Sequence, residues 1–222
     1  MSTSGSLSAT FRTVLGTIIF LLALLVLVVG WTIPFTFESS SILYRFGLEK
    51  IYLRSGKVIG ISAAILVFFQ LLLASRFTVL EQVFSIKRLV ALHRINGIAV
   101  TVLILCHPLL IKASENFTPY TFEKKYYPEF LGMALLAVLL VLAVTAMFRY
   151  FFNLSYAGWL QLHRLSATLA LFLLSAHILY VSETFKSGIP RNGALVIFCL
   201  NLLMIIRIQL RRFLQKAKSS RL

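Results

Sequence analysis

Residues 13–33, TVLGTIIFLLALLVLVVGWTI, form an uninterrupted run without a charged side chain. A helix needs about 20 mainly apolar residues to cross the hydrocarbon core of a bilayer. The run is longer than the apolar region of a signal peptide, and no A-x-A cleavage site follows it. It therefore predicts a retained membrane-spanning helix.

Five further apolar segments are predicted to span the membrane: 58–74, 89–111, 130–148, 157–181 and 193–208. The last is short and contains Arg207, whose long side chain can snorkel to the membrane surface. Apolar residues make up 59% of the 222-residue chain and charged residues 13%, whereas ordinary soluble domains are about a quarter charged. The sequence thus predicts an all-α integral membrane protein, a six-helix bundle.

The chain carries 22 Lys and Arg residues against seven Glu and no Asp, a formal net charge of +15. Such an excess in a soluble protein would suggest nucleic acid as a partner. Here the bases flank long apolar segments, as they do at the ends of membrane spans. The lipid bilayer, and no nucleic acid, is the partner that this pattern predicts.

An even number of spans places both termini on one side of the membrane. If that side is the cytoplasm, 13 of the 22 bases lie inside: Arg12, Arg76, Lys87, Arg88, Arg94, Arg149, Arg164, Arg207, Arg211, Arg212, Lys216, Lys218 and Arg221. Six of the seven acids then lie outside: Glu38, Glu49, Glu115, Glu123, Glu129 and Glu183. Because cytoplasmic segments are enriched in Lys and Arg, both termini are predicted to be cytoplasmic.

This reading divides the chain into a cytoplasmic N-terminus (1–12), a membrane domain (13–208) and a basic cytoplasmic tail (209–222). The extramembrane pieces are too short to fold as a nucleotide-binding domain, and the sequence contains no G-x-G-x-x-G or P-loop pattern. If the protein moves electrons, its reducing equivalents are expected to come from another chain.

The four histidines form two pairs with the same spacing. His93 and His107 lie in the third predicted span and His163 and His177 in the fifth, 14 residues apart in both cases. Fourteen residues rise about 21 Å along a helix and return to within roughly 40° of the same face. The third and fifth spans run in the same direction, so His93 is predicted level with His163 on the inner side, and His107 level with His177 on the outer side.

Two imidazoles that face each other at one depth are the axial ligands that a low-spin haem iron needs. Ionisable groups inside membranes are usually functional, which favours haem over histidines that only bridge packed helices. Zinc fits less well, because a tetrahedral site needs four ligands and neither level offers spare carboxylates. Cys106 adjoins His107 but points about 100° away around the helix, so it is expected to pack.

Three other side chains near the histidines have two readings each. Arg94 and Arg164 directly follow the inner histidines, where they are placed either to pair with haem propionates or to anchor the helices at the inner headgroups. The two roles are compatible. Phe172 lies midway between His163 and His177, either between two haems or as an ordinary packing residue.

A small transporter is the weaker alternative function. Ion-coupled transporters usually need carboxylates within the membrane, and the predicted spans contain none. A membrane scaffold without redox activity is the other alternative, and haem content separates it from a cytochrome.

The segments LHRINGIAVTVLILCH (residues 92–107) and LHRLSATLALFLLSAH (162–177) share a Leu-His-Arg start and a second histidine at the same distance. With six spans, this pattern resembles the ferric reductase-like transmembrane domain superfamily, over about residues 41–212. The superfamily includes ferric-chelate reductases, NADPH oxidases and the haem-binding membrane subunit of the bacterial methionine sulfoxide reductase system. Arg76, at the end of the second span, and Arg54, before it, are similar to arginines of the family; surface anchoring is the competing account of both.

The resemblance implies two b-type haems, with His93 and His163 as iron ligands at one level and His107 and His177 at the other. Oxidases and eukaryotic ferric reductases continue into FAD- and NADPH-binding domains, whereas this chain ends at Leu222. FAD and NAD(P)H are therefore expected only through a partner chain, a cytoplasmic flavin reductase or dehydrogenase. In the methionine sulfoxide reductase system, one position of the first histidine pair is expected to differ, and here all four are present.

The expected function is the membrane component of an oxidoreductase in the plasma membrane, or the inner membrane of a bacterium. Electrons would pass through two b-type haems from a cytoplasmic reductase to an outer acceptor, such as ferric iron, dioxygen or a periplasmic redox partner. A quinone-linked or methionine sulfoxide reductase-like haem subunit is the alternative. The outer bases available to an acceptor are Arg54, Lys57, Lys112 and Arg191. The basic tail is placed to dock an acidic reductase or to contact lipid headgroups.

Overall fold

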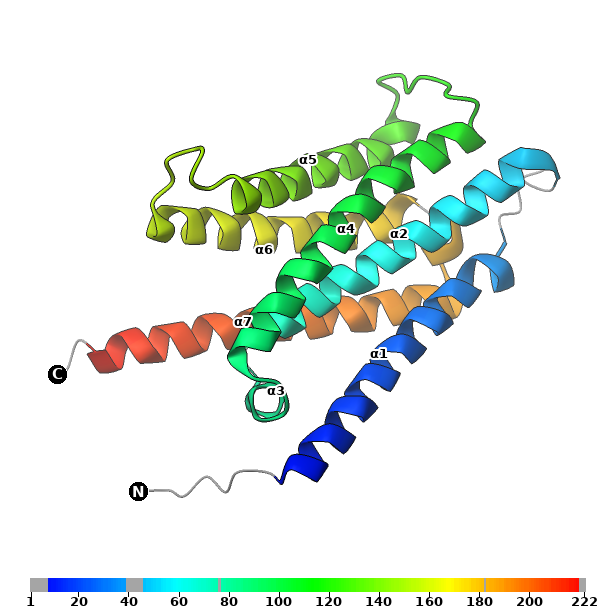
Figure 1. Ribbon diagram of the computed structural model, residues 1–222. Helices are drawn as coiled ribbons and strands as arrows, with labels where there is room; N and C mark the ends of the chain where they lie inside the picture. The colour runs from blue at the N-terminus through cyan, green and yellow to red at the C-terminus, as the bar shows by residue number, and fades with distance from the viewer. Residues whose placement is uncertain (1–7, 39–45, 76, 182, 220–222) are drawn as a thin grey trace.

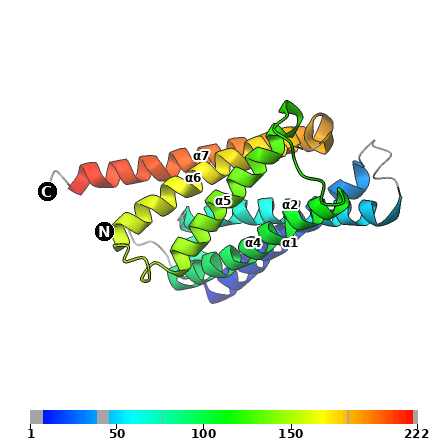
Figure 2. The ribbon, with the colours of Figure 1, turned by 90° about the horizontal axis from the view of Figure 1, so that it is seen from above.

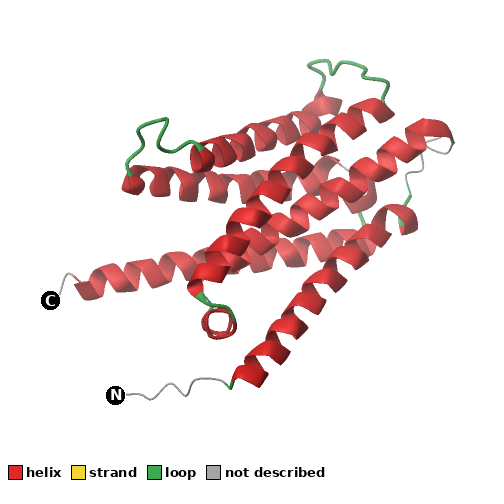
Figure 3. Cartoon of the chain, viewed as in Figure 1, coloured by secondary structure: helices red, strands yellow, loops and turns green. Residues whose placement is uncertain are grey.

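The computed structural model describes residues 8–38, 46–75, 77–181 and 183–219, without the side chains of 216–219. These residues form helices and loops, and no strand occurs among them (Figure 3). The elements are α1 (Ala9–Thr36), α2 (Gly47–Ala74), α3 (Thr78–Val83), α4 (Ile86–Ser114), the 3-10 helix η2 (Lys124–Tyr126), α5 (Tyr127–Met147), α6 (Tyr156–Val181), the 3-10 helix η3 (Glu183–Phe185) and α7 (Gly188–Ser219). Six of them, all but the short α3, η2 and η3, are long and apolar enough to cross a membrane. The predicted all-α, six-span membrane fold is confirmed.

The helices extend beyond the predicted spans at most ends. The sequence places Arg54 before the second predicted span. α2 begins at Gly47, however, so Arg54 lies inside this helix. α7 continues to Ser219 through most of the predicted basic tail, and the short α3 was not expected. Hydropathy locates the apolar centre of a span, whereas capping groups define its ends. Ser8 and Ser85, for example, accept hydrogen bonds from the main-chain N–H groups of Phe11 and Arg88 at the starts of α1 and α4.

Two helix pairs form the centre of the molecule. α2 packs along α4, and α5 packs along α6 (Figure 1). α1 lies against α2 and α3, and α7 lies against α6, η3 and α2. The view from above shows α1 at one margin of the bundle and α7 at the other (Figure 2). The four histidine-bearing turns therefore belong to α4 and α6, at the centre.

The buried cluster at the centre is small. It contains Ala63 and Val67 of α2, Val100 and Ile104 of α4, and Leu171 of α6. No large side chain among the described residues falls below 2% exposure, while many Leu, Ile, Val and Phe side chains face outward. Such a surface suits hydrocarbon as the solvent, because lipid tails are as apolar as the side chains that they touch.

α1 is attached to α2 by a polar contact within the membrane. The indole Nε1 of Trp31 donates a hydrogen bond of 2.8 Å to Oγ of Ser62, which is buried. The two helices approach each other closely beside this hydrogen bond, since a Cβ on Gly30 would lie 2.7 Å from Cδ1 of Ile65. Small residues and hydrogen bonds of this kind are what hold helices together in a bilayer.

The start of α1 and the end of α7 lie at the same end of the bundle, together with the connections from α2 to α4 and from α5 to α6 (Figure 1). We call this the inner end and the opposite one the outer end, following the predicted orientation. The placement of the inner end in the cytoplasm stays a prediction.

Cysteine labelling on intact cells tests that orientation. In a variant without Cys106 and Cys199, Thr118→Cys lies in the loop after α4 at the outer end, and Gln215→Cys lies near the end of α7. A membrane-impermeant maleimide should label Thr118→Cys directly and Gln215→Cys only after permeabilisation. The reverse pattern would place both termini outside.

A double-mutant cycle tests the contact between α1 and α2. Trp31→Phe and Ser62→Ala each remove one partner of the hydrogen bond. Their coupling energy in detergent unfolding should be about 0.6 kcal/mol, the average for hydrogen bonds between membrane helices. A coupling energy of zero would show that the bond contributes nothing to the packing of α1.

Candidate functional site

The structure brings the four histidines together as two facing pairs. His93 of α4 and His163 of α6 have ring centroids 6.4 Å apart at the inner level. His107 and His177, on the same two helices, are also 6.4 Å apart, at the outer level. The two ring planes of each pair are inclined to each other, at interplanar angles of 62° and 83°. The pairing agrees with the one predicted from helix direction.

The ring spacing fits two axial ligands of one metal ion. A metal–imidazole bond is about 2 Å long and the ring centre lies about 1.2 Å behind the nitrogen, so two rings on opposite sides of one ion have centres about 6.4 Å apart. The described residues contain no cluster of three or more His, Cys, Asp or Glu that could hold a metal. Each level thus offers two protein ligands, the number that a bis-histidine haem takes from the protein.

Main-chain carbonyls hold the outer histidines. Nδ1 of His107 lies 2.9 Å from the carbonyl oxygen of Gly56 in α2, and Nδ1 of His177 lies 3.3 Å from that of Pro128 in α5. A carbonyl only accepts hydrogen bonds, so Nδ1 carries the proton in both rings. Nε2 is then the nitrogen with a lone pair for a metal, and the hydrogen bond fixes this tautomer.

The inner histidines lack such partners. Nδ1 of His93 and Nδ1 of His163 are buried and make no hydrogen bond to any described residue. Nδ1 of His93 is turned toward the main chain of Gln70 in α2 without reaching hydrogen-bond geometry. The ring of Trp159 lies 5.4 Å from that of His163, and its buried Nε1 is also unpartnered within the described part of the chain.

The two arginines that follow the inner histidines are in different surroundings. Arg94 is exposed on α4, whereas Arg164 is half-buried on α6 and lies close enough to Arg212 of α7 to repel it electrostatically. Arg207 of α7 stacks 3.9 Å from the ring centroid of Phe77, and its Nη1 is buried without a partner in the described residues. Arg76 lies outside the described residues.

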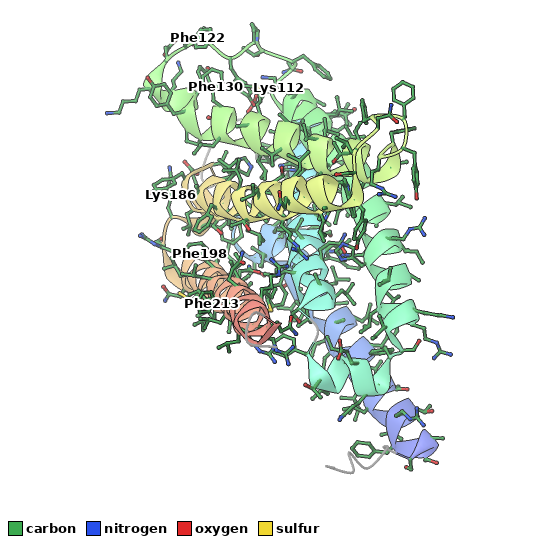
Figure 4. The ribbon with its side chains drawn as sticks, turned by 90° about the vertical axis from the view of Figure 1, so that its left-hand side faces the viewer. Lys112, Phe122, Phe130, Lys186, Phe198 and Phe213 are labelled. Carbon is green, nitrogen blue, oxygen red and sulfur yellow. The ribbon has the colours of Figure 1, made fainter. Side chains whose placement is uncertain are left out.

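The outer bases named as candidates for an acceptor all have partners within the chain. Arg54 pairs with Glu38 and covers the ring of Phe35, and Lys57 donates to Thr184 at 3.2 Å. Lys112 pairs with Glu115 at 3.1 Å, and Arg191 donates to the main-chain oxygen of Lys186. Figure 4 shows Lys112 at the outer end, beside the stacked rings of Phe122 and Phe130.

The two other candidates take up packing positions. The ring of Phe172 contacts that of Phe198 in α7, at a centroid distance of 6.2 Å. Cys106 is half-buried, Cys199 is exposed, and both are free thiols. The contact of Phe172 agrees with its packing alternative.

Sequence reasoning missed two glycines that lie against the outer histidines, Gly60 on α2 and Gly132 on α5. The signal for Gly60 was present in the sequence, since Gly56 and Gly60 form a G-x-x-x-G pattern, which is typical of close helix contacts. Gly132 and the inner residues Trp159 and Arg212 carry no comparable signal.

A comparison with known families identifies the transmembrane architecture. The family model of the ferric reductase-like transmembrane component matches residues 59–174, more than half of the chain. The chain belongs to this family. No curated protein and no solved structure matches the chain at a significant level.

The match places the chain among multi-pass membrane proteins of the ferric reductase-like family, whose class of function is electron transfer across the membrane and which generally bind haem. The matched segment contains α3, α4, α5 and most of α2 and α6, and thus both helix pairs at the centre. Three of the four histidines fall within it, and His177 follows three residues after its end.

Proposed function

We propose that this chain is a b-type dihaem membrane component that passes single electrons between a cytoplasmic reductase and an acceptor at the outer side. Family membership supports electron transfer across the membrane as the class of function. The observation that carries the finer proposal is the repeated ring spacing of 6.4 Å at two levels of the bundle.

The axial ligands would be His93 and His163 for the inner haem, and His107 and His177 for the outer one. Haem, when bound, supplies a one-electron centre, and the protein supplies binding, orientation and tuning of the potential. The two levels are 14 residues apart on each helix, about 21 Å along the helix axis. α4 and α6 therefore span the membrane with one ligand site near each surface.

Positive side chains at the inner level are placed to pair with the propionate groups of a haem. Arg164 is half-buried with Arg212 nearby, and the buried Nη1 of Arg207 has no partner among the described residues. Buried cations are usually paired. A propionate would provide the missing partner for these groups, and Arg94, which is exposed, is the weaker of the two predicted propionate partners. Membrane anchoring at the inner headgroups remains the competing role of both arginines.

The proposed donor is a flavoprotein reductase or dehydrogenase that brings FAD and NAD(P)H to the inner end. The basic last turns of α7, which include Arg211 and Arg212, would meet an acidic surface of that protein or the anionic headgroups of the plasma membrane. The proposed acceptor at the outer end is ferric iron, dioxygen or a redox protein. Because the outer bases are partnered within the chain, an anionic acceptor would have to compete for them.

The test of this function is a reduced-minus-oxidised absorption spectrum of the detergent-purified chain, with haem quantified per chain. Two low-spin haems per chain are expected, from expression in a haem-replete host. One haem would favour the quinone-linked or methionine sulfoxide reductase-like alternative. Purified, folded protein without haem would contradict the proposal. It would favour the alternative that the histidines only bridge packed helices.

Single histidine substitutions test the assignment of ligands to levels. His107→Ala and His177→Ala should each remove the same haem and leave most of the other one, because they remove opposite ligands of one iron. His93→Ala and His163→Ala should remove the second haem. Cys106→Ala, adjacent to His107, is the control and should keep both. The level-by-level pairing is wrong if His93→Ala bleaches the haem that is lost in His177→Ala.

A further inference from the structure

Each outer histidine lies against a glycine of the neighbouring helix. A Cβ on Gly60 would lie 2.7 Å from Cε1 and 2.8 Å from Nδ1 of His107. A Cβ on Gly132 would lie 2.6 Å from Cε1 and 2.9 Å from Nδ1 of His177. Van der Waals contacts between carbon atoms have their optimum at about 3.5–4.0 Å, so any larger residue at either glycine would push the ring away.

The same ring that touches the glycine is hydrogen-bonded one turn earlier on the same helix. Nδ1 of His107 meets the oxygen of Gly56, four residues before Gly60, and Nδ1 of His177 meets the oxygen of Pro128, four residues before Gly132. Residues four apart lie on one face of a helix. The pairs α2 with α4 and α5 with α6 therefore hold their outer histidine by the same two contacts.

The inner level repeats these contacts only in part. Nδ1 of His93 is turned toward the main chain of Gln70, fourteen residues after Gly56, without reaching hydrogen-bond geometry. Fourteen residues after Gly60 and Gly132, on nearly the same helix faces, stand Ala74 and Ala146. The helices of each pair run in opposite directions, so these alanines are in register with the inner histidines. Nδ1 of His93 and Nδ1 of His163 make no hydrogen bond to the described residues.

We propose that Gly60 and Gly132 are positioning residues for the outer ligand pair. The absence of a Cβ lets each ring come close enough for its Nδ1–H to reach the carbonyl, which leaves Nε2 as the metal ligand. The inference rests on the proposed dihaem function and goes beyond it, since it assigns the geometry of the outer level to two glycines whose places at the inner level are taken by alanines. The hydrogen bond from Nδ1–H to the carbonyl orients the ring and raises the basicity of the ligand.

The experiment compares Gly60→Ala and Gly132→Ala with the wild-type chain, purified in full length. The readouts are haem per chain, the low-spin electron paramagnetic resonance signals and the midpoint potentials from a redox titration. Each variant should lose the haem that His107→Ala loses, which halves the haem content, and keep the other haem with an unchanged signal and potential. If the outer haem is retained, its potential should rise, because a less basic ligand stabilises the ferric state less.

Two further glycines serve as matched controls. A Cβ on Gly193 would meet nothing within 4 Å, so Gly193→Ala should keep both haems. A Cβ on Gly97 would meet Nε2 of Gln70, at the end of a flexible side chain between α2 and α4. Gly97→Ala thus disturbs the same helix pair as Gly60→Ala without touching His107, and it should spare the outer haem.

The outcomes separate this inference from the proposed function. If the wild-type chain binds two haems and both glycine variants keep the wild-type signals and potentials, the positioning role is overturned and the dihaem function stands. Loss of both haems in both variants would also overturn it, because an outer-level role requires the inner haem to survive. Absence of haem from the wild-type chain would overturn both proposals.

Discussion

The hydrogen bond from Nδ1 of each outer histidine to a main-chain carbonyl is the interaction on which the rest of the centre depends. It requires the backbone of a second helix at the ring edge, and this forces α2 onto α4 at Gly56 and Gly60, and α5 onto α6 near Pro128 and Gly132. These are also the two helix pairs that pack most extensively. Helix pairing and the orientation of the outer histidine rings are consequently one geometric condition, satisfied twice in the molecule.

The bilayer explains why a few contacts can determine the arrangement of the helices. Apolar side chains gain little by leaving lipid for the protein interior, so hydrophobic burial does not select one helix arrangement over another. The described chain has only a small buried cluster, and most large apolar side chains face outward. Close approach at small residues, together with isolated hydrogen bonds such as Trp31 to Ser62, decides which helices meet and in which register.

The parts of this architecture that follow from periodicity could be predicted from the sequence. Apolar length gives the six spans, and the shared spacing of 14 residues gives the pairing of His93 with His163 and of His107 with His177. Features that depend on contacts between distant segments could not be predicted. Arg54 proved to lie within α2 and to pair with Glu38 after α1, which no local pattern encodes. Likewise, Gly132 stands alone in an apolar run, and only the fold reveals that a Cβ at this position would lie 2.6 Å from Cε1 of His177.

The fixed charges of the chain, counted without any propionate, add a constraint on electron movement. The acids lie mostly at the outer end, where they neutralise Arg54 and Lys112, while at the inner end Arg164 lies near Arg212 with positive charge in excess. A fixed positive field stabilises added negative charge, so the chain itself favours an electron at the inner level. A membrane potential that is negative inside acts in the opposite sense, by about 2.3 kcal/mol per 100 mV for a full crossing. The charges of the protein therefore oppose outward transfer as proposed. The free energy that drives it must come from the membrane potential and from the difference in reduction potential between donor and acceptor.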